Sequence, residues 1–246
     1  MFVYKYCYLY ELVQEIKLVH IRTSLYSWHG CLMPSKTYAV LIADVMESRA
    51  RAGLRGLLGQ KLAAISRRHL RRKLIQLPYT VTAGDEFQTV TRSLASIPAV
   101  IRDLRVALRP LSLRIGVGFG RVPGRIQPPV NRLGGEAFQS ARKAVESVKA
   151  GSLFKFEVLT AFVSRHERFD KTINLIYALH DTLVLQITAR QWETIEGFME
   201  APTLERTARR LKLDPSTVSR NLKRSYYWQV KETVSVAGSL IKDRFC

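Results

Sequence analysis

Three acidic residues of the chain lie where predicted strands end. Asp44 follows an apolar run at residues 38–43, and Asp85 and Glu86 join two β-rich runs at 79–83 and 87–90. If these strands are neighbours, their carboxylates converge at one end of a sheet, where like charges repel. A divalent cation removes this repulsion, and Mg²⁺ binds through few carboxylates plus the phosphates of a substrate. The arrangement therefore indicates a Mg²⁺ or Mn²⁺ site.

Each acid taken alone also has a purely structural explanation. Asp44 can cap the helix that follows it, and Asp85 is a common turn former. For Asp85 by itself, the turn is the preferred interpretation, so the metal hypothesis depends on the group and not on one residue.

Basic residues follow Asp44 closely and suit a phosphate-bearing partner. The chain has 39 Lys and Arg against 20 Asp and Glu, a net charge of +19. Such a surplus attracts nucleic acids, nucleotides or anionic membranes. No apolar run approaches the ~20 residues that a membrane span requires, so a membrane partner is not expected. A predicted helix over 47–76 carries much of the charge, and its first arginine, Arg49, is placed to hold a polyphosphate.

A second group of polar residues lies near the C-terminus, in a segment at 188–224 that predicts three short helices. The third helix leaves hydroxyl, amide and basic side chains exposed, which are the groups that base edges and phosphates require. We therefore expect a helix-turn-helix that binds DNA. An ordinary solvated helical hairpin and a cap for a dimer or protein partner are the alternatives. The expected DNA-binding residues are Ser216, Thr217, Ser219, Arg220, Asn221, Lys223 and Arg224.

Capping residues set the limits of these three helices. Thr188 and Thr203 are expected to cap the first and second helices. Asp214 and Pro215 are expected to open the third, after a turn that includes Lys212. The apolar positions that remain predict a small core, formed by Trp192, Ile195, Phe198, Ala208, Leu211, Leu213, Val218 and Leu222.

The elements before this segment alternate between strand and helix. Their order is strand, helix, hairpin, helix (94–108), strand (111–120) and helix (136–149), with an edge strand within 154–162. The order predicts an α+β fold, with a sheet covered by helices on one face. From residue 170 the pattern is helical throughout. We therefore expect one domain over 33–169 and an all-α domain over 170–246.

Residues 1–32 differ in composition from the rest of the chain. They hold half of the tyrosines and no secretory signal pattern. We expect a mis-assigned start, with Met33 as the true first residue; a short helix at 11–21 packing on the body is the alternative. The three cysteines, Cys7, Cys31 and Cys246, form neither a disulfide framework nor a metal site, which fits a reducing, cytoplasmic location. The glycines of the 111–120 strand lack a P-loop lysine and are expected to permit close packing.

Four segments occur in a specific order: YAVLIADVMESR, VTAGDEFQ, LRIGVGFG and GGEAFQSARKAVE. Over residues 38–228 the chain resembles the SatD family. The resemblance implies that the sheet is palm-like (ferredoxin-like), in a palm domain of the class III nucleotidyl cyclase and GGDEF kind, followed by a helix-turn-helix similar to sigma-factor region 4 and LuxR. It also implies a homodimer, because palm cyclases often complete their site across two subunits.

The resemblance also implies roles for particular residues. Asp44 and Asp85 would hold the metal ion, and Glu86 would be able to replace one of them. Arg142 would be the catalytic arginine that stabilises the transition state; the alternative is an ordinary surface position on a helix whose Phe138, Ala141 and Val145 face the core. The backbone amides of Val45, Met46, Glu47 and Ser48 would face the phosphates.

Two positions differ from the cyclase pattern. Val81 stands where a lysine reads the base, and Phe138 stands where an asparagine orients the ribose. The leading hypothesis is therefore a DNA-binding regulator whose palm-like domain binds a metal-nucleotide, a nucleoside triphosphate, or a nucleic-acid ligand. The alternative is a metal-dependent nucleotidyltransferase or cyclase tethered to DNA. A third interpretation is a degenerate palm that serves as a dimer scaffold.

Overall fold

The computed structural model describes residues 36–46 and 54–246 of the chain. The expectations for residues 1–32, including the start at Met33 and the helix at 11–21, lie outside the described residues. The described residues combine a five-stranded sheet with helices, which confirms a mixed α+β fold.

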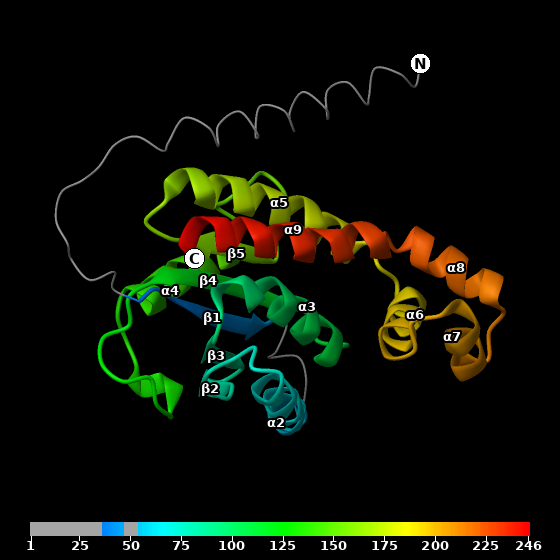
Figure 1. Ribbon diagram of the computed structural model, residues 1–246, viewed down its shortest axis with the longest axis horizontal. Helices are drawn as coiled ribbons and strands as arrows, with labels where there is room; N and C mark the ends of the chain where they lie inside the picture. The colour runs from blue at the N-terminus through cyan, green and yellow to red at the C-terminus, as the bar shows by residue number, and fades with distance from the viewer. Residues whose placement is uncertain (1–35, 47–53) are drawn as a thin grey trace, which may run out of the picture. The chain divides into compact units, whose positions relative to one another are not determined.

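The sheet has the strand order β2-β3-β1-β4-β5 (Figure 1). Strand β1 (Tyr38–Val45) pairs antiparallel with both β3 (Glu86–Val90) and β4 (Leu113–Gly120). The hairpin partner of β3 is β2 (Thr80–Ala83), as predicted, and Gly84 in their turn has a φ of 61°. Strand β5 (Thr160–Val163) pairs parallel with β4, and it is much shorter than the expected strand.

One face of the sheet is covered by α2 (Leu54–Arg71) and α3 (Ile97–Ala107), which follows the short 3-10 helix η3 (Leu94–Ser96). Alternate residues of β1, such as Leu41 and Ala43, pack against Leu62 of α2 and Leu104 of α3. This follows from strand geometry, in which successive side chains point to opposite faces. Helix α2 ends at residue 71 rather than 76, and Lys73 adopts a left-handed φ of 56° just beyond it.

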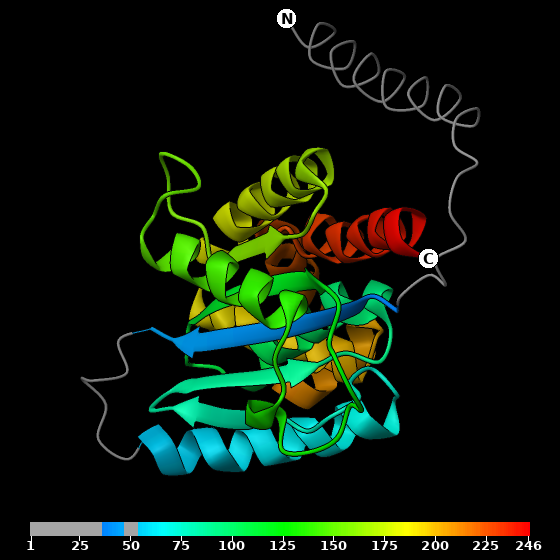
Figure 2. The same cartoon turned by 90° about the vertical axis from the view of Figure 1, so that its left-hand side faces the viewer.

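The opposite face is covered by α4 (Glu136–Lys149), which follows the 3-10 helix η4 (Val130–Arg132). Val40 and Ile42 of β1 pack here against Ala141 and Val145, and Figure 2 shows α4, in green, beside the blue strand β1. The prediction of helices on one face was therefore wrong. Strands β1 and β4 are apolar on both faces, and an apolar face must be covered.

Two glycines of β4 allow α4 to lie unusually close to the sheet. A Cβ added at Gly118 would lie closer than 3.0 Å to the backbone of Ala137 and Ala141, and one at Gly116 would meet Val145 in the same way. The expectation that the glycines of this strand permit close packing is confirmed.

Helix α5 (Glu167–Leu185) lies along β5 and hydrogen-bonds to its free edge. The amide of Asn174 both accepts from the Phe162 N–H at 2.7 Å and donates to its carbonyl at 2.9 Å. Carboxylates of Asp170 and Asp181 accept from the N–H groups of Ser164 and Leu159. These side chains satisfy backbone groups that a strand edge otherwise leaves unpaired.

The C-terminal helix α9 (Tyr227–Phe245) lies beside α5 and returns to the sheet (Figure 1). Ala237 and Ile241 are buried in the same core as β1 and α3. Residues 36–246 form one compact unit, and the expected boundary near Phe169 falls in the first turn of α5. The described part of the chain has no helix long and apolar enough to cross a membrane.

Three short helices occupy the segment expected to bind DNA: α6 (Ala189–Glu200), α7 (Leu204–Leu211) and α8 (Pro215–Arg224). Thr188, Thr203 and Asp214 each accept a hydrogen bond from a backbone N–H of the helix that they cap, as predicted. Lys212 ends α7 in the left-handed region, with a φ of 52°. The small core contains Ile195, Phe198, Ala208, Val218 and Leu222, with Trp192 and Leu213 packed against it.

The close approach of α4 leads to a stability prediction. Gly118→Ala should lower the free energy of unfolding by about 2–3 kcal/mol, because backbone atoms of α4 must move to admit the methyl group. Gly59→Ala is the matched control: it lies on α2 with open space around it and should raise stability by about 0.5–1 kcal/mol. Urea denaturation measures both. Equal stability of the Gly118→Ala variant and the wild type would contradict the packing argument.

Candidate functional site

The three acidic residues converge at one end of the sheet. Asp44 lies directly opposite Glu86 in the β1–β3 register, so both side chains are on the face that α4 covers. Asp85 lies in the adjoining β2–β3 turn, and its charge acts on Asp44. The convergence that the sequence predicted is therefore present.

Glu86 is held by Arg142, the residue expected to be catalytic. The guanidinium donates to both carboxylate oxygens, with N–O distances of 2.5 and 2.7 Å. The Thr82 hydroxyl donates to the same carboxylate at 3.1 Å. Burial raises the pKa of Glu86, but the hydrogen bonds and charge of Arg142, with help from Thr82 and Lys149, bring that pKa below its ordinary value. Glu86 is thus an ionised, fully engaged partner of Arg142.

Asp44 is in a different electrostatic environment. Its carboxylate lies 3.5 Å from the Lys149 ammonium and 3.9 Å from the Arg114 guanidinium. Burial raises the pKa of Asp44, Lys149 lowers it, and the charge of Asp85 raises it again, so the net shift is upward. Asp44 therefore has less compensating positive charge than Glu86.

Lys149 and Arg114 were not predicted as site residues. Lys149 lies one heptad after Arg142 on α4, where both face the carboxylates. Arg114 is opposite Asp44 in the β1–β4 register. Helical spacing from Arg142 would have singled out Lys149, whereas the position of Arg114 depends on a strand pairing that the sequence does not reveal.

The expected phosphate-binding amides are described only in part. Val45 is a buried core residue, and the Met46 N–H donates to the Ser112 carbonyl at 2.9 Å. The Met46 amide is therefore not free to bind a phosphate, because the backbone pairing of β1 continues into the segment before β4. The remaining candidates, Glu47, Ser48 and Arg49, lie outside the described residues.

The two positions that differ from the cyclase pattern have clear surroundings. Phe138 is 9% exposed and packs beneath the sheet with Val40 and Val122. Val81 is 44% exposed on the edge strand β2. Phe138 therefore serves the core.

Two carboxylates are suited to a divalent cation. Asp44 and Asp85 repel each other, and Asp44 has no hydrogen bond shorter than its 3.5 Å approach to Lys149 among residues 36–46 and 54–246. Glu86 does not fit a ligand role, because Arg142 holds both of its oxygens. The described residues contain no cluster of three or more His, Cys, Asp or Glu that could hold a metal. A magnesium ion bound by two carboxylates plus ligand phosphates needs no such cluster.

The residues expected to bind DNA separate into two groups on α8. Five are exposed: Ser216, Ser219, Arg220, Lys223 and Arg224. Asn221 and Thr217 are half-buried. The Asn221 amide donates to the Thr194 hydroxyl of α6 at 3.0 Å, and Thr217 accepts from Arg220 at 3.2 Å. Asn221 therefore joins two helices, a role that its exposed-looking sequence position did not reveal.

The pairing of Arg142 with Glu86 predicts a pH-dependent stability. Arg142→Met should lower the free energy of unfolding at neutral pH by about 1–2 kcal/mol, because the buried Glu86 carboxylate loses the donor that contacts both of its oxygens. The pKa of Glu86 lies below its ordinary value of 4.5. The ionised carboxylate therefore contributes to the free energy of unfolding at pH values above 4.5, and this contribution is lost as the pH falls below 4.5. The difference from wild type should therefore shrink in acid.

Lys143→Met is the control, because Lys143 is an exposed neighbour on the same helix. Denaturation of all three proteins across this pH range measures the effect. A difference that persists unchanged in acid would show that Arg142 stabilises the fold by some means other than the Glu86 charge.

Comparison with known proteins identifies the family. A search of curated proteins found no match. The family model described as "SatD family (SatD)" matches residues 38–239, which include the whole sheet, the carboxylate site and helices α6–α8. The chain belongs to the SatD family.

Proposed function

We propose that the protein is a DNA-binding regulator whose α6–α8 unit is a helix-turn-helix of the sigma-region-4 and LuxR kind. The observation that carries the proposal is the exposed face of α8, where Ser216, Ser219 and Arg220 lie in the first two turns. In such modules the N-terminal part of the recognition helix contacts base edges in the major groove.

Charges around α8 support contact with the phosphate backbone. Lys223 and Arg224 are exposed in its last turn, and Arg206, Arg209 and Arg210 are exposed on α7. Basic side chains at the margins of a recognition helix position the protein without reading sequence. The net charge of +19 adds a long-range attraction to any polyanion.

The sheet is proposed to be a palm-type domain that binds a metal-nucleotide. The antiparallel order β2-β3-β1-β4, with α2 and α3 packed on one face, supports a ferredoxin-like arrangement. Asp44 and Asp85 would hold Mg²⁺ or Mn²⁺, which would neutralise phosphate charge in a bound ligand. Lys149 and Arg142 line the same end of the sheet and would contribute positive charge, with Glu86 keeping Arg142 in place.

A nucleotidyltransferase or cyclase is the second candidate function. The position of Arg142 beside the carboxylates favours it, because a cation there would stabilise charge developing on a phosphate. Phe138 and Val81 argue against a purine cyclase, since neither side chain forms hydrogen bonds with a base or ribose.

DNA binding predicts that Arg220→Ala costs about 1–3 kcal/mol of affinity and relaxes selectivity at one base position. The duplex to use is the sequence enriched by the wild-type protein from a random duplex library, with a scrambled duplex beside it. Arg168→Ala is the control, because Arg168 is an exposed arginine of α5. Fluorescence anisotropy at fixed salt measures the duplex affinity of all three proteins. Equal losses of affinity in both variants would mean that only net charge matters. Failure of the wild type to enrich any duplex from the library would refute the proposal.

Metal-nucleotide binding predicts that Asp85→Asn weakens the affinity for a Mg²⁺–triphosphate complex by about tenfold or more. Asparagine preserves the turn, so the loss would reflect the missing charge. Calorimetry with each of the common nucleoside triphosphates, with Mg²⁺ and then Mn²⁺, measures it. Asp243→Asn, an exposed change on α9, is the control.

Mass spectrometry of the same mixtures separates the two candidate functions. A new product that is absent with Asp85→Asn would make the protein an enzyme. Binding without product would support the regulator. If the wild type binds no metal-nucleotide, the palm part of the proposal is wrong, whatever the result with DNA.

A further inference from the structure

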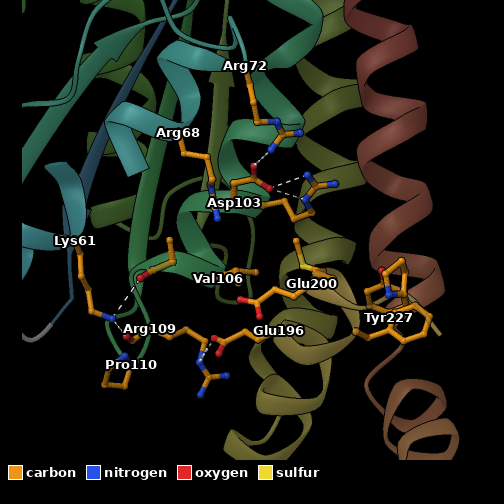
Figure 3. Close-up of a pocket in the computed structure, with 15 residues that line it drawn as sticks. Lys61, Arg68, Arg72, Asp103, Val106, Arg109, Pro110, Glu196, Glu200 and Tyr227 are labelled. Carbon is orange, nitrogen blue, oxygen red and sulfur yellow. Dashed lines mark hydrogen bonds and ion pairs between the residues drawn. The ribbon is translucent and has the colours of Figure 1, made fainter. Parts of the chain in front are cut away.

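A cleft of about 700 Å³ lies away from the carboxylate site, between α2 and α3 on one side and α6, Pro202 and the start of α9 on the other (Figure 3). None of Asp44, Asp85 and Glu86 lines it. Its volume is within the range of about 300–1,000 Å³ typical of small-molecule sites. The cleft is therefore large enough for a metabolite and is chemically separate from the proposed metal site.

Basic side chains dominate the polar lining of the cleft. Three acidic residues, Asp103, Glu196 and Glu200, face five basic ones. The basic residues are Lys61, Arg68, Arg72, Arg102 and Arg109.

The acidic residues offset only part of this positive charge, and each already has a partner: Glu196 lies 3.8 Å from the Arg109 Nε atom. Asp103 is shared by Arg72 at 2.9 Å and Arg102 at 2.7 Å, and buried His69 hydrogen-bonds to it as well. Burial raises the pKa of Asp103, but His69 and Arg102 lower it to about 2, so the carboxylate remains charged and orients both guanidinium groups. Glu200 pairs with Arg210, which does not line the cleft.

Two of the basic residues, Arg68 and Lys61, retain hydrogen-bonding capacity for a ligand. Within the described part of the chain, no carboxylate is within ion-pair distance of Arg68, and Figure 3 shows this side chain directed toward the space beside Asp103 and Val106. Lys61 donates to the carbonyls of Ala107 and Arg109, which keeps its ammonium at the end of α3.

An apolar wall faces these cations. The side of the cleft at α6 and the start of α9 is lined by Phe198, Met199, Pro202 and Tyr227. The rings of Phe198 and Tyr227 are edge to face, with their centroids 5.4 Å apart. An aromatic ring or an arginine plane can stack against a flat ligand group. The cleft thus combines phosphate-binding cations with a surface for an apolar or aromatic moiety.

We propose that this cleft binds a small phosphorylated molecule bearing an aromatic or apolar group, of which a nucleotide is the simplest representative. The phosphate would contact Arg68 and Lys61, while Asp103 holds Arg72 and Arg102 in position beside it. The bound ligand would touch both the sheet-covering helices and α6. This site requires no metal and does not rest on the function proposed for the carboxylates or for α8.

Calorimetry of the full chain with pyrophosphate and with adenosine diphosphate, both in chelator to exclude divalent cations, tests the proposal. Arg68→Glu should weaken the binding of both probes by about 10–100-fold, because a charge-assisted contact becomes a repulsion. The matched control is Arg67→Glu, which changes an exposed neighbour on α2 that does not line the cleft. This control should change affinity by about twofold or less, because exposed charges are screened. Circular dichroism confirms that the variants fold.

The outcomes are distinguishable. Tighter binding of adenosine diphosphate than of pyrophosphate supports a ligand whose base-like group contacts the apolar wall. Equal binding of the two probes overturns that part of the proposal and leaves a site for inorganic phosphates alone. Equal losses in the two arginine variants, or no binding by the wild type, overturn the proposal. A loss of duplex DNA binding in Arg68→Glu without a loss of either small probe also overturns it, and would make the cleft part of a nucleic-acid surface. Asp85→Asn should leave cleft binding unchanged.

Discussion

The contact between α4 and β4 is the packing interaction on which the candidate site depends. Because Gly116 and Gly118 have no side chain, the backbone of α4 rests almost directly on the strand. This closeness places Arg142 and Lys149 over the carboxylates of β1 and β3. A larger residue at either glycine would raise the helix and separate the cations from the acids. The distances between the charged groups of the site therefore depend on having glycine, which has no side chain, at both positions.

A second constraint is the burial of charged groups between the helices and the sheet. Arg105 of α3 pairs with Asp181 of α5 at 3.1 Å, and it also donates to Thr160 of β5. Both charges are almost completely buried, so removing either partner would leave an isolated charge and be strongly destabilising. Asp181 also accepts from the Leu159 N–H. One ion pair thus connects α3, α5 and the edge strand β5, and these elements together support α9 and the basic cleft.

Local features of the fold were predictable because they depend on residues within a few positions of one another. The β2–β3 hairpin follows from a glycine turn between β-rich runs, and the caps Thr188, Thr203 and Asp214 act on the next turn of helix. The turn at Lys212 was also expected, and the structure shows that this lysine adopts the left-handed conformation, which is uncommon for a residue other than glycine. The convergence of Asp44 with Glu86 was correct because it required only that two strands pair.

The amino-acid sequence by itself determined the elements and the three-helix unit, since backbone propensity and apolar periodicity act locally; it predicted the approach of the acidic residues only on the condition that β1 and β3 pair. Only the tertiary structure decided which acid is available. Arg142, 56 positions along the chain from Glu86, donates a hydrogen bond to its carboxylate, and the Asn221 amide donates one to the Thr194 hydroxyl. The second covered face differs, because the continuous apolar run of β1 already indicates burial on both sides of the sheet; the sequence does not show which helix covers that face. Long-range pairing is a property of packing, and no local pattern encodes it.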